Sequence, residues 1–116
     1  MAMQILEQKI PISEVHELAK EWYEIMIKGT VDIERNRVAL GSDYHMDTCE
    51  LLVKDGSHQK DVWGFNIRFD DPSGKPTVEF DSLVNIKPAF GNLSRAIANQ
   101  DIIKTATDII YSWIIF

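Results

Sequence analysis

Hydrophobic and polar residues alternate in two successive runs between residues 62 and 87. The first run has apolar side chains at every second position: Trp63, Phe65, Ile67 and Phe69. The second run shows the same alternation, interrupted by Ser82 and Leu83: Val78, Phe80, Val84 and Ile86. A period of two is typical of strands with one buried face. Because the polar segment 70–76 separates the runs, the pattern predicts an antiparallel hairpin.

The register of this hairpin follows from keeping both apolar faces on the same side of the sheet. The favoured register has three apolar pairs: Phe69 opposite Val78, Ile67 opposite Phe80, and Trp63 opposite Val84. It also places Arg68 opposite Glu79 and Asn66 opposite Asp81, and facing opposite charges stabilise a sheet. The neighbouring register, with Phe69 opposite Pro76, sets Arg68 against Thr77 and loses that pairing. The first register is therefore predicted.

Two segments show the three-to-four-residue spacing of amphipathic helices. The first stripe is Val15, Leu18, Ala19, Trp22, Ile25 and Met26. This helix is predicted to begin after Ser13 as its N-cap and to end at Gly29. The second stripe is Ile102, Ile103, Ala106, Ile109, Ile110, Trp113 and Ile114. It predicts a helix from about Gln100 to the end of the chain.

The remaining segments are shorter. Residues 30–41 predict a hairpin that turns at Arg35-Asn36. Its predicted pairs are Val31 with Leu40, Ile33 with Val38, and Glu34 with Arg37. Asp47 and Glu50 have the spacing of a capping box, which predicts a helix starting at Asp47 with residues 51–53 buried and an end at Asp55-Gly56. Residues 4–8 read as an edge strand or an extended arm, and residues 89–98 as an irregular connection.

The order of these elements predicts one α+β domain over residues 1–116. We expect an antiparallel sheet of two hairpins, with a possible added N-terminal strand, packed on one face by helices. The other face of the sheet then carries polar side chains: Asp32, Glu34, Arg37, Asn66, Arg68, Glu79, Asp81, Asn85 and Lys87. That face is either solvated, as antiparallel sheets allow, or the place where function lies.

Composition narrows the classes of function. The net charge of −6 argues against binding to nucleic-acid backbones, which requires a positive surface. The single cysteine, Cys49, excludes an intrachain disulfide and indicates a reducing compartment, the cytoplasm. No apolar run reaches the ~20 residues that span a bilayer, and no signal peptide is recognised, so we expect no membrane association.

A metal site is the first chemical hypothesis. Asp43, His45 and Asp47, with Glu50 one turn further on, place carboxylates and an imidazole close together. Such a set is able to hold a divalent metal that activates water. The spacing matches no established metal motif, however. The alternative is that these residues cap a helix and shape a turn.

Glu79 and Asp81 form a second candidate, because alternate residues of a strand project from the same face. Two such carboxylates can act as an acid–base pair when their surroundings separate their pKa values. The alternative is that Arg68 neutralises Glu79 and Asn66 donates a hydrogen bond to Asp81 on a solvated surface.

A third candidate is an anion site in the irregular connection. The residues that would hold the anion are Lys87, Asn92, Ser94 and Arg95, through ammonium, guanidinium and turn donors. In the alternative, they satisfy backbone groups of a long loop.

Two further features concern single residues. Cys49 near a helix N-terminus is expected to have a lowered pKa, unless it is simply a buried side chain. The apolar ending at Phe116 is expected to pack into the domain or across an interface between subunits.

The chain resembles a family of small bacterial and archaeal proteins catalogued as domain of unknown function 5674. The resemblance covers most of the chain, through the segments Met3–Gln8, Val31-Asp32, Ala39–Gly41, His45–Asp47, Glu50–Leu52, Gly56-Ser57, Gln59, Trp63-Gly64, Asn66, Glu79–Leu83, Asn85–Pro88, Gly91-Asn92 and Ser94-Arg95. Lys87 and Leu93 depart from the arginines expected there, which weakens the anion site. The resemblance implies a small soluble protein and emphasises the same polar residues, without implying a reaction or a cofactor.

Two interpretations follow from the sequence. The leading one is a non-enzymatic module that forms a homo-oligomer or binds a protein partner. The other is a hydrolase-like enzyme, with or without a divalent metal, that uses Asp43, His45, Asp47 and Glu50. A pocket in which these groups converge with Glu79, Asp81 or Arg95 would favour the enzyme.

Overall fold

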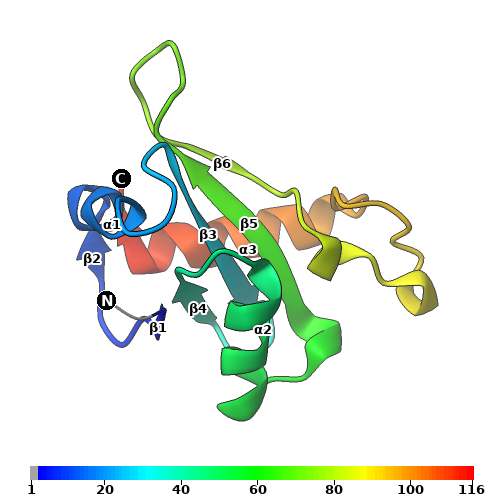
Figure 1. The fold of residues 1–116 in the computed structure, drawn as a ribbon. Helices are drawn as coiled ribbons and strands as arrows, with labels where there is room; N and C mark the ends of the chain where they lie inside the picture. The colour runs from blue at the N-terminus through cyan, green and yellow to red at the C-terminus, as the bar shows by residue number, and fades with distance from the viewer. Residues whose placement is uncertain (1–2) are drawn as a thin grey trace.

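A five-stranded antiparallel sheet and three helices make up the computed structural model, which describes residues 3–116 (Figure 1). The strands lie in the order β1 (Gln4–Ile5), β4 (Arg37–Leu40), β3 (Met26–Asp32), β5 (Val62–Arg68) and β6 (Thr77–Glu79). The helices are α1 (Ile12–Ala19), α2 (His45–Lys54) and α3 (Gln100–Trp113). A separate parallel pair joins β2 (Ile10–Pro11) to β7 (Ile114–Ile115). The predicted α+β class is confirmed, and an edge strand is present at Gln4–Ile5. The final helix begins at Gln100 as predicted, but it ends at Trp113, because Ile114 pairs with Ile10 in β7 instead of continuing the helix.

The main hydrophobic core lies between the sheet and the pair α1 and α3. Trp63, Phe65 and Ile67 of β5 pack there, and Phe80 is partly buried against the same cluster. The prediction that these aromatic side chains share one face is therefore confirmed. Helix α2 lies in front of the sheet and α3 behind it (Figure 1), so helices cover parts of both faces. On the α2 side, Cys49 and Leu52 pack against Ala39 and Val62 in a smaller cluster.

The register predicted for the central hairpin is wrong by two residues. The structure pairs Asn66 with Glu79, Ile67 with Val78, and Arg68 with Thr77. This is the neighbouring register that the charge argument rejected. The charge pairing nevertheless survives, because Arg68 Nη1 reaches Glu79 Oε1 diagonally at 3.4 Å. A long arginine side chain can make such a diagonal contact, so the ion pair does not distinguish the two registers.

The second strand of that hairpin is also shorter than predicted. Strand β6 ends at Glu79, and Val84 lies in a 3₁₀ turn, Leu83–Asn85, instead of in a strand. The Asn85 side chain takes over the pairing with β5: its Oδ1 accepts a hydrogen bond from Gly64 N at 2.7 Å, and its Nδ2 donates to Gly64 O at 3.1 Å. An asparagine amide thus replaces the ladder of a strand.

The first helix is shorter than its hydrophobic stripe suggested. Helix α1 ends at Ala19, its N-cap is Pro11 and not Ser13, and Met26 already belongs to β3. Gly29 is not a helix terminator but lies in the middle of β3. A Cβ on Gly29 would lie 2.7 Å from Phe65 Cζ and 2.8 Å from Ala39 O, so the glycine allows the close packing of three strands.

The hairpin of β3 and β4 has its turn where it was predicted, and Asn36 adopts the positive φ of 56°. Its register is shifted by two residues from the prediction, with Val31 opposite Val38 and Asp32 opposite Arg37. The shift arises because Asp32 Oδ1 accepts hydrogen bonds from the backbone N–H groups of Glu34 and Arg35. These bonds turn the chain before residue 34 can continue the strand.

Helix α2 begins two residues earlier than predicted, and no side chain caps it. Asp47 lies within the first turn, where its Oδ2 accepts a hydrogen bond from Ser42 Oγ. The capping-box prediction is therefore wrong. Val53 is exposed, and the buried side chains are His45, Thr48, Cys49 and Leu52. The earlier start turns the His45 side chain onto the sheet.

The C-terminal residues partly pack into the domain. Ile114 is buried in β7, and the Phe116 ring lies 4.6 Å from the Tyr111 ring. Ile115 is exposed. Within residues 3–116, no helix has the length and apolar character needed to cross a membrane.

Candidate functional site

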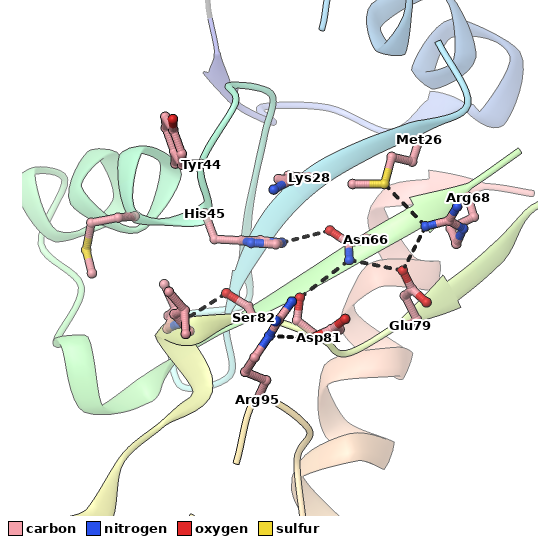
Figure 2. A pocket seen from close by; sticks show the side chains of 13 residues that line it. Met26, Lys28, Tyr44, His45, Asn66, Arg68, Glu79, Asp81, Ser82 and Arg95 are labelled. Atoms are coloured by element: carbon pink, nitrogen blue, oxygen red, sulfur yellow. Dashed lines mark hydrogen bonds and ion pairs between the residues drawn. The ribbon is translucent and has the colours of Figure 1, made fainter. Parts of the chain in front are cut away.

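A cleft of about 360 Å³ lies between the N-terminal end of α2, strands β3, β5 and β6, and the segment that follows β6. Figure 2 shows the side chains that converge on it. The lining residues are Met26, Lys28, Tyr44, His45, Met46, Asn66, Arg68, Glu79, Asp81, Ser82, Leu83, Val84 and Arg95. This is the face of the sheet opposite the main core, which was predicted to be polar. The cleft therefore concentrates polar chemistry where the sheet is not covered.

The floor of the cleft is a hydrogen-bonded pair, His45 and Asn66. His45 Nε2 lies 2.9 Å from Phe65 O and 2.8 Å from Asn66 Oδ1. Asn66 Nδ2 donates to Glu79 Oε1 at 3.1 Å and to Asp81 O at 3.4 Å. Because those two oxygens only accept, the amide must turn its Oδ1 toward the imidazole. The ring nitrogen then faces two acceptors, so Nε2 carries the proton and Nδ1 keeps a lone pair.

Burial favours the neutral form of the His45 imidazole. Burial, as the main cause, holds its pKa below the ordinary value of 6.5, and the charge of Lys28 acts in the same direction. The hydrogen bond to Phe65 O opposes this shift without overcoming it. A neutral ring in this tautomer offers the cleft an acceptor.

Two arginines of the cleft are held by carboxylates. Arg68 pairs with Asp70 Oδ2 at 2.9 Å and with Glu79 Oε1 at 3.4 Å. Arg95 Nε lies 2.7 Å from Asp81 Oδ1. Glu79 and Asp81, proposed from the sequence as an acid–base pair, thus each bind an arginine. Asn66 contacts the Glu79 side chain but only the backbone of Asp81, which differs from the predicted pairing.

The third cation, Lys28, is arranged differently. Its Nζ lies 5.3 Å from the centroid of the Tyr23 ring, and Tyr23 Oη donates to Asp43 O at 3.3 Å. Among residues 3–116, no carboxylate forms an ion pair with this ammonium group, in contrast to Arg68 and Arg95. In Figure 2, Lys28, which belongs to β3, lies beside His45 of α2.

The proposed metal ligands do not converge. His45 directs Nε2 at the sheet, Asp47 accepts from Ser42, and Asp43 and Glu50 are exposed. In the described part of the chain, no three His, Cys, Asp or Glu side chains are grouped as a metal site would require. Of the set proposed for a hydrolase, only His45 reaches the cleft with Glu79, Asp81 and Arg95.

Ser82 brings a buried hydroxyl group to the lining of the cleft. A Cβ on Gly64 would lie 2.5 Å from Ser82 Oγ and 3.2 Å from His45 Cδ2, so the hydroxyl lies beside the carbon edge of the imidazole. Its Oγ accepts a hydrogen bond from Val84 N, and the residue is buried. This geometry gives Ser82 the role of shaping the 3₁₀ turn that follows.

The side chains of the four residues proposed for an anion site do not converge on one point. Lys87 is buried, and its Nζ donates to Gln59 O at 2.9 Å and to Val84 O at 3.2 Å. Asn92 is also buried and holds the irregular connection through bonds to Asn85 O, Ser94 O, Ala96 O and Ala98 N. Ser94 bonds to Ala96 O, and Arg95 faces the cleft. The arrangement matches the alternative in which these residues organise the loop.

Cys49 matches the alternative in which it is a buried side chain. Burial raises the pKa of its thiol, and this effect exceeds the opposing influence of Lys87. The helix N-terminus was expected to lower that pKa, but the thiol packs in the small cluster against Leu52 and Val62. It is a buried, unreactive side chain by this measure.

A second groove, of about 370 Å³, adjoins the cleft. Met46, Leu83 and Val84 line both hollows. Around the two hollows, five large apolar side chains are 40–71% exposed: Tyr44, Met46, Leu83, Ile86 and Phe90. We call this surface the binding face.

Sequence reasoning missed several residues of the site. Lys28 falls inside the first helix as it was predicted, which ended at Gly29, and Tyr44, Met46 and Leu83 received no role. The sequence held part of the signal for Lys28. Met26, Lys28, Thr30 and Asp32 occupy every second position of β3 and so share one face of the strand, but the helical stripe that ended at Met26 masked this pattern.

A family model, DUF5674, matches residues 4–113 and is described as a protein of unknown function. Neither the curated proteins nor the solved structures contain a match to the chain.

Proposed function

The chain belongs to the DUF5674 family, whose function is unknown, and we propose that it is a non-enzymatic module that binds a protein partner. The partner would bind through the binding face. The observation that carries this proposal is the group of exposed apolar side chains around two adjoining hollows. Contiguous exposed apolar surface costs free energy in water and marks interaction sites.

The shape of the binding face supports a macromolecular partner. The two hollows adjoin along Met46, Leu83 and Val84, and the apolar side chains project outward around them. An extended segment is able to cross both hollows, whereas a small molecule would fill one. Leu83 lies between the hollows and is 71% exposed, which makes it the central contact of the proposed interface.

The chemistry of the cleft favours binding over catalysis. Its carboxylates are engaged by Arg68 and Arg95, and the hydroxyl of Ser82 accepts a hydrogen bond from Val84 N. An acid–base mechanism needs a base aligned with a nucleophile or with a water molecule. Recognition needs only complementary shape and charge.

We also propose that the protein acts in the cytoplasm. Its single cysteine, Cys49, is buried and free, which suits a reducing compartment.

The test is site-specific photo-cross-linking in the native cell. A photoreactive benzoylphenylalanine replaces Leu83 in one variant and Leu93 in a control variant. Leu93 is 75% exposed but lines neither hollow. We expect a discrete adduct from position 83 and none from position 93. The captured protein must then bind the purified chain, with its affinity reduced at least tenfold by Leu83→Asp and unchanged by Leu93→Asp.

Three results would overturn the proposal. The first is no adduct at position 83, and the second is equal labelling at both positions. The third is an adduct of twice the mass of the chain, which would replace the partner by a second copy and make the protein a homo-oligomer. Size-exclusion chromatography with light scattering on the wild type distinguishes that last result.

A further inference from the structure

Lys28 carries a charge that the cleft leaves unmatched. It lies on β3 opposite Asn66 of β5, half-buried, with its ammonium group over the Tyr23 ring. Tyr23 is in turn held by its hydrogen bond to Asp43 O. The lysine is therefore positioned by an aromatic contact, while its hydrogen-bond donors are left for another group.

The other charges around the cleft are already in ion pairs. The lining residues include three cations, Lys28, Arg68 and Arg95, and two carboxylates, Glu79 and Asp81. Each arginine has a carboxylate within 3.4 Å. Arg68 is also paired with Asp70, at 2.9 Å. Lys28 is therefore the one cation of the lining that has no carboxylate partner within residues 3–116.

Resting on the proposed function, we infer that the cleft recognises the carboxylate of an Asp or Glu side chain in the partner, placed at Lys28, with neighbouring apolar residues of the partner on Tyr44, Met46 and Leu83. The apolar contacts come from exposed side chains of the same cleft. The partner segment would thus combine one acidic residue with flanking apolar ones.

The charge balance selects a carboxylate over a phosphate. A phosphorylated side chain carries nearly two negative charges at neutral pH. In this cleft it would meet one unmatched cation and two carboxylates, Glu79 and Asp81. A single negative charge also matches Lys28 and meets only about half of that repulsion. An internal acidic side chain suits the place because the second groove continues past Leu83, so the partner chain need not end there.

The experiment titrates ¹⁵N-labelled protein with short peptides while its backbone amide signals are followed by NMR. The probes are acetyl-Leu-Glu-Leu-amide, its Gln analogue, and acetyl-Leu-Gln-Leu with a free C-terminal carboxylate. We expect the Glu peptide to bind at least fivefold more tightly than the Gln peptide. Its shifts should be concentrated at Lys28, His45 and Ser82.

Lys28→Met isolates the charge, because methionine keeps much of the apolar stem. In this variant the preference for Glu over Gln should fall below twofold, while the Gln peptide binds as before. Lys104→Met is the matched control, because Lys104 is exposed on α3 and pairs with Asp108. It should leave the preference unchanged. Unaltered circular dichroism and thermal unfolding of both variants would show that they are folded.

Three outcomes overturn the inference: no preference for Glu in the wild type, a preference that persists in Lys28→Met, or a gain confined to the free C-terminal carboxylate. Its failure is separable from that of the proposed function. If a partner is captured at Leu83 but the Glu peptide is not preferred, only the inference of a carboxylate site is refuted. If the preference for Glu depends on Lys28 but no adduct forms at Leu83, only the proposal of a protein partner is refuted.

Discussion

The side-chain amide of Asn85 forms two hydrogen bonds with the backbone of Gly64, in the place that a neighbouring strand would occupy beside β5. Its Nδ2 also donates to Arg95 O at 3.0 Å. One buried side chain therefore joins the strand, the 3₁₀ turn after β6 and the irregular connection. Since Leu83 and Arg95 lie on those two segments, Asn85 fixes a wall of the cleft.

Asn85→Ala should be strongly destabilising. The substitution removes three hydrogen bonds and leaves the buried N–H and C=O of Gly64 without these partners. Unsatisfied buried groups cost about 1–3 kcal/mol each, so we expect the free energy of unfolding to fall by about 3–4 kcal/mol in urea denaturation. The control is Asn99→Ala, which removes the N-cap of α3 and should cost about 1 kcal/mol. Equal losses in the two variants would contradict the role given to Asn85.

Gly64→Ala should displace the segment that carries Ser82. The added Cβ would lie 2.5 Å from both Cβ and Oγ of Ser82, which is closer than non-bonded atoms allow. Overpacking of this kind costs about 1–3 kcal/mol. Replacing Ser82 by glycine removes the clash, so the double variant Gly64→Ala/Ser82→Gly should be more stable than the sum of the single effects by at least about 1 kcal/mol. Additive losses in urea unfolding would show that Ser82 does not limit the space at Gly64.

Acidification should destabilise the fold through His45. Burial, as the main cause, lowers its pKa below 6.5, so between pH 6.5 and the folded-state pKa the unfolded chain binds a proton that the folded chain does not. The free energy of unfolding should therefore fall as the pH decreases from 7 to 5, a range above that in which most carboxylates titrate. His45→Gln should flatten this decline, and His58→Gln, at an exposed position, should retain it. Parallel profiles for all three proteins would exclude His45 as the source.

Ile114 and Ile115 should respond very differently to truncation. Ile114 is 1% exposed and its neighbour is 58% exposed, although both belong to β7. Large-to-small substitution in a core costs about 2–5 kcal/mol, so Ile114→Ala should lower the free energy of unfolding by about 3 kcal/mol. Ile115→Ala should change it by about 0.5 kcal/mol or less. Thermal unfolding compares the two directly, and similar losses would indicate that Ile115 is buried in solution, for example by a second copy.

Element types were predictable where the periodicity was long and unbroken. The stripe of α3 and the alternation of β5 each follow one period over several residues, and both elements are confirmed, although α3 ends at Trp113 and not at the end of the chain. The first helix was overextended because Ile25 and Met26 happen to continue its spacing, although the chain turns after Ala19. A short turn between a helix and a strand leaves no mark on the hydrophobic pattern alone.

Registers were not predictable, and the reason is chemical. In both hairpins the observed register differs by two residues, a shift that keeps every side chain on its face. Facial alternation cannot detect such a shift. Long side chains also adapt, as the diagonal Arg68–Glu79 pair shows. The registers instead accompany hydrogen bonds made by short polar side chains. Asp32 accepts two such bonds at the turn between β3 and β4, and Asn85 bonds to Gly64 of β5 beyond the end of β6.

The candidate site was only partly predictable for the same reason. His45, Glu79, Asp81 and Arg95 were recognised as polar residues with chemical potential, and the fold brings them to one cleft. Lys28 was missed because its strand was mistaken for the end of a helix. Lys87 and Asn92 are polar residues that point inward, and nothing in their sequence spacing distinguishes a buried structural amide from a ligand-binding one.

The pairing of β2 with β7 has a consequence for how the chain reaches its native state. Ile10 lies opposite Ile114, so these two short strands meet only after nearly the entire chain has been looped back on itself. Such remote contacts carry a large entropic penalty before they return any stabilisation, and they form late in folding. Among the paired strands, β2 and β7 should accordingly be the first to exchange their amide protons, even though Ile114 is as inaccessible as the residues at the centre of the sheet.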